Sequence, residues 1–136
     1  MRLEGKVAIV TGGARGLGRQ SALALAEAVF RRVVRGLAPG MTEKAVAWAM
    51  EKGMREAGAD AVSFSTIVAF GPNSALPHAV PGDRALKPGE PILFDWGARL
   101  NGYCSDTSRT VILGEPDESG RRRPVPQKDS TFLMTA

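Results

Sequence analysis

The sequence has very little of what stabilises small secreted proteins or anchors a chain in a membrane. Its 136 residues contain one cysteine, Cys104, which cannot form an internal disulfide. This favours a reducing compartment, by default the cytoplasm, or a fold that needs no disulfides. Long apolar runs are also missing near the start, where residues 7–10 form a run of only four residues, against about 20 for a membrane span. We therefore expect no targeting segment and no membrane partner.

The central part of the chain lacks a net positive charge. The net charge is +4, a value that can indicate nucleic-acid binding. Basic residues exceed acidic ones by two in residues 1–28 and by three in residues 119–136, whereas residues 29–118 carry a net charge of −1. The basic triplet 121–123 has no aromatic residues among it, which is typical of a solvated tail. We expect no nucleic-acid partner.

The N-terminal segment combines an apolar run with closely spaced glycines. Residues 7–10 lead into a turn that contains Gly12, Gly16 and Gly18, and an alanine- and leucine-rich stretch follows. This order predicts a strand, a phosphate-binding turn and a helix. The three glycines would let the backbone approach a pyrophosphate at the helix N-terminus. Residues 1–28 resemble the opening of short-chain dehydrogenases/reductases, which implies NAD(P) as a cofactor held by these glycines.

The rest of that family's pattern is missing. A second strand ending in a ribose-binding acid should follow roughly 20 residues after the last glycine. Residues 29–37 instead place apolar side chains at helical spacing. The family's catalytic Tyr-x-x-x-Lys pair is also missing, because Thr107 stands four residues after Tyr103, the only tyrosine. The interpretation as an NAD(P)-binding oxidoreductase therefore depends on residues 1–28 alone. The alternative for Gly12, Gly16 and Gly18 is a tight strand-to-helix turn that binds no ligand.

Two helices are expected before any further strand. Nothing near residue 28 breaks a helix, so residues 18–37 are predicted as one continuous helix. After a Pro-Gly turn, Thr42 is a good N-cap, and apolar residues recur every three or four positions until Gly58. Residues 62–70 then predict a strand, and residues 71–91 a proline-rich loop.

A hairpin with two aspartates is the strongest local prediction. Asn101-Gly102 lies between apolar runs and predicts a two-residue turn joining two strands within residues 91–113. This register places Asp106 opposite Gly97, and alternation puts Asp95 on the same face. Two carboxylates so close favour a divalent cation between them. Asp95 and Asp106 are therefore candidate metal ligands, with a solvated polar face as the alternative.

Several motifs in residues 29–118 resemble one known family, in order and at the right spacing. They lie at residues 35–43, 64–69, 71–78, 86–90, 95–97 and 102–110. These motifs look like the catalytic domain of Xaa-Pro aminopeptidases and prolidases, and of the wider pita-bread metallopeptidase family that includes methionine aminopeptidases. The resemblance implies a hydrolase that cleaves N-terminal peptide bonds at a dinuclear Mn, Co or Zn centre.

The resemblance also implies roles for individual residues. Asp95 would hold one metal and Asp106 would bridge both, whereas His78 would hydrogen-bond the peptide substrate without binding metal. An ordinary loop histidine is the alternative for His78. The family completes its centre with a further histidine and two glutamates later in the chain, but this chain has one histidine and no glutamate after Glu118. We therefore expect weak metal binding and negligible peptidase turnover.

The expected organisation is an α/β (α+β) chain in three parts. Residues 1–28 would form a Rossmann-like strand, glycine turn and helix start, and residues 29–118 the N-terminal half of a pita-bread domain, with two helices and an antiparallel hairpin. Residues 119–136 would be an irregular basic tail. Such a chain reads as a truncated fusion, and a non-functional fusion product is the third interpretation. Exposed sheet edges would favour homo-oligomers.

Overall fold

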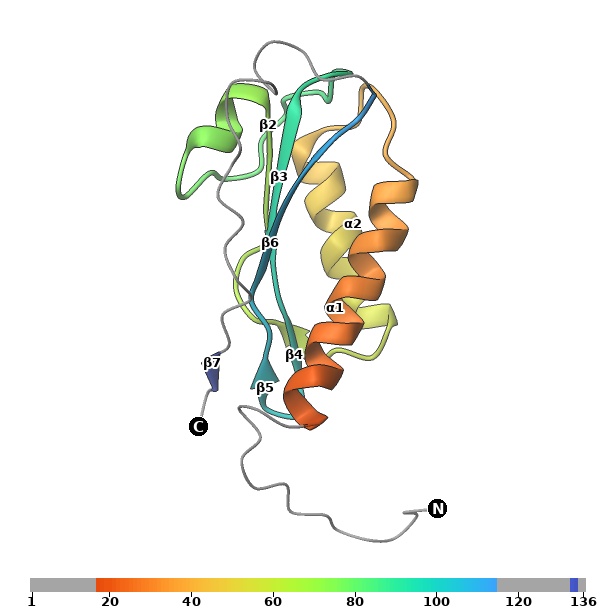
Figure 1. Ribbon diagram of the computed structural model, residues 1–136, viewed down its shortest axis with the longest axis vertical. Coiled ribbons are helices and arrows are strands. Elements are labelled where there is room, and N and C mark those ends of the chain that lie inside the picture. Colours follow the sequence, from red (N-terminus) through yellow and green to blue (C-terminus); the bar gives the residue numbers. More distant parts are fainter. Residues whose placement is uncertain (1–16, 115–132, 135–136) are drawn as a thin grey trace, which may run out of the picture.

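The computed structural model describes residues 17–114 and 133–134, which form a helical layer packed on one side of β-structure (Figure 1). Helix α1 spans Leu17–Arg35 and helix α2 spans Glu43–Glu56. The two helices lie side by side and run in opposite directions (Figure 1). None of the described helices is long and apolar enough to cross a membrane.

Helix α1 confirms the prediction of one uninterrupted helix, although it ends at Arg35, two residues early. Its buried side chains recur at helical spacing and face the sheet; they are Ala22, Ala26, Val29 and Phe30. Helix α2 begins as predicted, because the Thr42 side chain accepts a hydrogen bond from the backbone N–H of Ala45 at 3.2 Å. Both helices therefore form where local sequence predicts them, and their apolar faces determine how they pack.

Among the described residues, the strands form two sheets. One has the order β2-β3-β6, and the other has the order β1-β4-β5-β7. The strands of the first sheet are β2 (Ile67–Phe70), β3 (Pro91–Trp96) and β6 (Thr107–Ile112). Those of the second are β1 (Ala61–Val62), β4 (Ala98–Leu100), β5 (Tyr103–Cys104) and β7 (Leu133–Met134).

The prediction of a single strand over residues 62–70 is wrong. The structure has β1 and β2 there, separated by residues 63–66. β1 pairs with β4 and β2 pairs with β3, so the chain changes sheets between them. The composition of this stretch, rich in β-branched and aromatic residues, does not reveal such a change. The proline-rich loop also contains a short 3-10 helix, η1, at Gly71–Ala75.

The hairpin forms in the predicted register over its whole length. Leu100 pairs with Tyr103 beside the turn, and Asp95 pairs with Ser108 farther along. Asn101 and Gly102 have φ values of 52° and 81°, the left-handed conformations that such a turn requires. Each arm is interrupted, however, at residue 97 on one side and residues 105–106 on the other, so the hairpin passes from one sheet to the other.

The core lies between the helices and the alternate residues of β3. Ile92, Phe94 and Trp96 are fully buried. The ring of Phe30 stacks on Trp96 with centroids 4.5 Å apart and meets Phe94 edge-on at 5.2 Å. The indole N–H of Trp96 donates to the carbonyl of Ala26 at 3.0 Å, which satisfies a buried donor. The remaining β3 side chains, including Asp95, therefore point to the face that α1 and α2 do not cover.

Candidate metal centre

The two predicted metal ligands lie on opposite arms of the hairpin, Asp95 two residues before the interruption at residue 97 and Asp106 within the interruption at residues 105–106. Asp95 is half-buried at the end of β3, and its Oδ1 accepts a hydrogen bond from the Ser108 hydroxyl at 3.0 Å. This bond confirms that residues paired across the hairpin share a face. Asp106 is half-buried and directly precedes β6. Because Trp96 pairs with Thr107 and the Ser105 N–H donates to the Ala98 carbonyl, Asp106 faces Gly97 as predicted.

Gly97 serves the hairpin for a reason that sequence alone did not indicate. A Cβ at this position would overlap the carbonyl oxygen of Ser105 and would lie 2.9 Å from the Ser63 hydroxyl. Glycine is therefore needed because the backbone of the opposite arm approaches Gly97 closely. We call this close approach of Gly97 and Ser105 the hairpin crossing; it lies between the positions of Asp95 and Asp106 on the two arms.

The donor chemistry of the pair suits a divalent cation only in part. Carboxylate oxygens are the hard ligands that such cations take in proteins. The described residues contain no group of three or more histidine, cysteine, aspartate or glutamate side chains placed to hold a metal. Asp95 and Asp106 therefore fit as two ligands of a centre whose remaining ligands the described residues do not provide.

His78 comes from a different connection. It lies exposed in the segment that follows η1, and Leu76 and Val80, two residues away on either side, are 54% and 84% exposed. The segment begins at the end of β2 that pairs Phe70 with Ile92, whereas Asp95 pairs with Ile67 at the opposite end of that strand. The roles of His78 and of the aspartates thus remain predictions.

Sequence reasoning missed Glu43, the only charged side chain among the described residues that is buried, at 1% exposure. It follows the N-cap, and an acid in the first turn of a helix suggests no more than a favourable charge. In the structure its carboxylate accepts hydrogen bonds from the backbone N–H groups of Phe70 and Gly82 and from the Asn73 side chain. No local signal reveals these partners, because they lie 27 to 39 residues away.

The predicted dinucleotide-binding glycines are only partly visible. Gly12 and Gly16 lie outside the described residues. Gly18 lies in the first turn of α1, where a Cβ would overlap the Tyr103 ring. For Gly18, close packing of an aromatic ring is therefore a sufficient reason for glycine.

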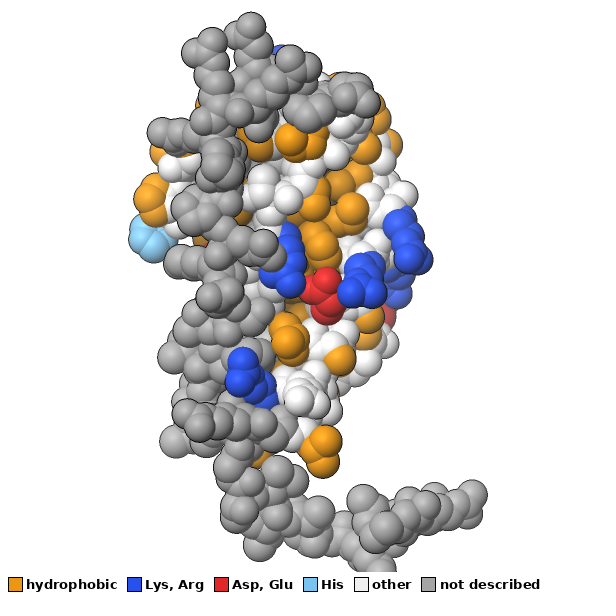
Figure 2. All heavy atoms as spheres, viewed as in Figure 1, with side chains coloured by type: hydrophobic (Ala, Val, Ile, Leu, Met, Phe, Trp, Pro, Cys, Tyr) orange, Lys and Arg blue, Asp and Glu red, His pale blue; other side chains and the backbone are white. Residues whose placement is uncertain are grey.

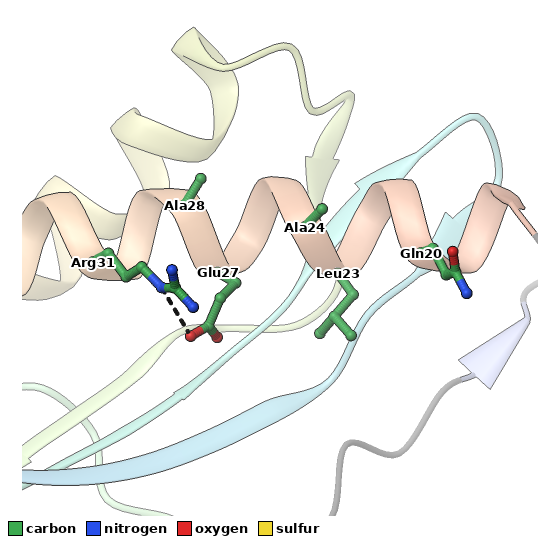
Figure 3. Close-up of a pocket in the computed structure, with 6 residues that line it drawn as sticks. All are labelled: Gln20, Leu23, Ala24, Glu27, Ala28 and Arg31. Atoms are coloured by element: carbon green, nitrogen blue, oxygen red, sulfur yellow. Dashed lines mark ion pairs between the residues drawn. The ribbon is translucent and has the colours of Figure 1, made fainter.

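A separate pocket of about 450 Å³ lies along α1 (Figure 3). The residues that line it are Gln20, Leu23, Ala24, Glu27, Ala28 and Arg31. Glu27 forms ion pairs with Arg31 at 3.5 Å and with Arg109 of β6 at 3.8 Å. Figure 2 shows basic side chains beside an acidic one on this face. The pocket lies on the helical layer, whereas Asp95 points to the opposite side of the sheet.

Comparisons with known proteins identify the fold and the family. The model of metallopeptidase family M24 matches residues 19–128. An uncharacterized peptidase of Bacillus subtilis, YqhT, is 42% identical over 99 residues, which is 73% of this chain and 28% of the relative. An uncharacterized peptidase of Staphylococcus aureus, SAB1567, is 39% identical over 102 residues, or 75% of this chain and 29% of that protein. The chain thus spans less than a third of the length of these relatives.

Solved structures of peptidases resemble the fold of this chain. The X-Pro aminopeptidase of Thermotoga maritima superposes with a TM-score of 0.73 at 39% identity, over 76% of this chain and 30% of that one. The prolidase of Pyrococcus furiosus superposes with a TM-score of 0.71 at 35% identity, over 76% and 31%. These neighbours confirm the expected partial pita-bread fold, and they give no support to the dehydrogenase-like interpretation of residues 1–28. The chain belongs to the metallopeptidase family M24.

Proposed function

We propose that this chain supplies the first part of a dinuclear metal centre in a peptidase of the Xaa-Pro aminopeptidase or prolidase type. The observation that carries the proposal is the pair Asp95 and Asp106, which face the same hairpin crossing in a chain of family M24. The substrate would be a peptide cleaved near its N-terminus. Support for this class comes from the solved neighbours, described as an X-Pro aminopeptidase and a prolidase.

In this proposal Asp95 and Asp106 would hold the Mn, Co or Zn ions, Asp95 as a ligand of one ion and Asp106 as a shared ligand. When bound, the ions supply an activated water and polarise the peptide carbonyl. The hydroxyl of Ser108 donates to Asp95 Oδ1 and so restricts the orientation of that carboxylate, as partners behind metal ligands commonly do. His78 hydrogen-bonds the peptide and takes no part in metal binding.

We further propose that the 136-residue polypeptide binds metal weakly and has negligible turnover by itself. Two aspartates cannot fill two coordination spheres, and water is a poor substitute for the further histidine and glutamates that the family uses. A polypeptide segment that supplies these ligands would restore binding. We also propose that the chain is cytoplasmic. Strands β2 and β6 are the edges of the three-stranded sheet among the described residues, and we propose that copies of the chain associate through them.

Thermal unfolding with added ligand tests the proposal. A ligand that binds only the folded chain raises the midpoint, and the two tryptophans report the transition. We expect excess Mn²⁺ to raise the midpoint of the unmodified chain and to have no effect on Asp95→Asn or Asp106→Asn. Asp83→Asn is the matched control, because Asp83 is exposed and pairs only with Lys44 among the described residues.

Two outcomes would contradict the proposal. A Mn²⁺ effect that persists in both aspartate variants would place the metal elsewhere. A rise in the midpoint with NADPH and none with Mn²⁺ would favour the dinucleotide-binding alternative for Gly12, Gly16 and Gly18.

A further inference from the structure

The buried carboxylate of Glu43 holds both ends of one segment, residues 70–82. Its Oε1 accepts from the Phe70 N–H at 2.8 Å and from Asn73 Nδ2 at 3.0 Å. Its Oε2 accepts from the Gly82 N–H at 2.9 Å. A single side chain at the start of α2 thus joins the point where the segment leaves β2 to the point where it returns.

The returning end is also paired with the chain around Glu43. The Lys44 N–H donates to the Gly82 carbonyl and the Glu43 N–H donates to the Arg84 carbonyl, each at 3.1 Å. Thr42 forms a bridge with Ala85. The start of α2 therefore acts as a template for the return of the segment, and the carboxylate of Glu43 connects this template to β2.

Between its fixed ends the segment carries His78. Residues 75–78 and residue 80 are exposed, whereas Ala79 is buried at 7% exposure. The exposed stretch includes the apolar side chains of Leu76 and Val80 on either side of the histidine. Because His78 itself is exposed, its position depends on the backbone of the segment, which is anchored at its two ends and packed at Ala79.

We propose that Glu43 is a positioning residue that determines where His78 meets the peptide substrate. This inference rests on the proposed function, because the substrate contact of His78 belongs to it. The chemistry requires a carboxylate: its two oxygens only accept hydrogen bonds, and all its partners here are N–H donors. Glutamine would keep the shape but place an NH₂ group against at least one donor, so one end of the segment would lose its anchor.

The first test compares Glu43→Gln with Glu56→Gln, the same substitution at the exposed end of the same helix. We expect Glu43→Gln to reduce the hydrogen-exchange protection of the Gly82 or Phe70 amide by about 10- to 100-fold, as loss of a hydrogen bond to a charged group does. Glu56→Gln should leave both amides unchanged, because Glu56 forms only exposed ion pairs with Arg32 and Lys52 within the described region.

The second test measures the position of His78 directly. The chain has one histidine, so its two ring C–H signals are assigned without ambiguity. Mn²⁺ bound at the aspartates broadens nearby signals in a distance-dependent way. We expect Glu43→Gln to change the broadening of the His78 signal while that of the Ser108 amide stays the same. Glu56→Gln, which removes no contact of the segment, should change neither.

The outcomes separate this inference from the proposed function. If Mn²⁺ broadens neither signal, or still broadens Ser108 in Asp95→Asn, the metal proposal is wrong. If Mn²⁺ binds through Asp95 but Glu43→Gln leaves the His78 signal and both amides unchanged, Glu43 does not position the histidine. Should Glu43→Gln fail to fold, Asn73→Ala removes one donor from the segment and should still alter the His78 broadening; an unchanged signal there would overturn the inference.

Discussion

Replacement of Gly97 by alanine tests whether the hairpin crossing shapes the candidate metal centre. The added Cβ would overlap the Ser105 carbonyl oxygen and approach the Ser63 hydroxyl at 2.9 Å. The first contact is with backbone, so relief requires one arm of the hairpin to move. Gly36→Ala is the matched control, since its Cβ would meet the nearest heavy atom, the Val33 carbonyl oxygen, at an ordinary 3.6 Å.

The magnitude follows from this geometry. Overpacking that forces backbone to shift costs about 1–3 kcal/mol and occasionally more, so we expect about 3 kcal/mol for Gly97→Ala. A folded unit of about 100 residues has a total stability of roughly 5–15 kcal/mol, so this loss is a large fraction. At about 4–8 °C per kcal/mol, the midpoint should fall by roughly 12–24 °C. Gly36→Ala should leave the midpoint unchanged or raise it slightly, because alanine lowers the entropy of the unfolded chain.

Thermal and urea unfolding of both variants, followed by tryptophan fluorescence, measure the difference. The Mn²⁺ titration is then repeated on Gly97→Ala at a temperature at which the variant is folded. We expect its stabilisation by Mn²⁺ to be lost, because each arm carries one of the two aspartates and a shift of either arm separates them from their present arrangement. Equal midpoints for the two alanine variants would refute the argument from the crossing.

Three further substitutions test other parts of the structure. Thr42→Ala should lower the free energy of unfolding by about 1 kcal/mol in urea titration, because it removes the cap of α2. Phe30→Ala should cost about 3–5 kcal/mol, because this ring packs against Trp96 and Phe94, and fluorescence of the folded state should change with it. Asn101→Val should lower the free energy of unfolding by about 1–2 kcal/mol, since a β-branched residue is disfavoured at a φ of 52°. Asn101→Gly should be tolerated, because glycine adopts positive φ readily. Equal unfolding midpoints for these two variants would contradict the turn geometry.

Local patterns predicted much of this fold because they depend on neighbouring residues. The cap at Thr42 and the apolar spacing of α2 place the second helix within one or two residues. The Asn101-Gly102 turn has a single register that suits its left-handed backbone, and this register carries through to Asp95 and Ser108. The pairing of Asp106 with Gly97 follows directly from that turn.

Other features could not be predicted because they arise from contacts between distant segments. Residues 62–70 are rich in β-branched and aromatic residues throughout, yet the two parts of the stretch pair with different strands, Val62 with β4 and Ile67 with β3. The hairpin register places Gly97 opposite Asp106 but does not reveal that the Ser105 backbone requires a glycine there. Apolar periodicity does not reveal which strand will lie alongside.

Glu43 shows most clearly which features the local sequence determines and which the tertiary structure determines. The residues around it predict a helix start with a favourable charge, and that prediction is correct. Its burial depends on N–H groups 27 and 39 residues away, which reach it only when α2, β2 and the returning chain pack together. Local sequence thus determines the helices, the hairpin register and the placement of the two aspartates on its arms. Only the packed fold makes Glu43 a buried anchor, because a carboxylate is buried only where hydrogen-bond donors surround it.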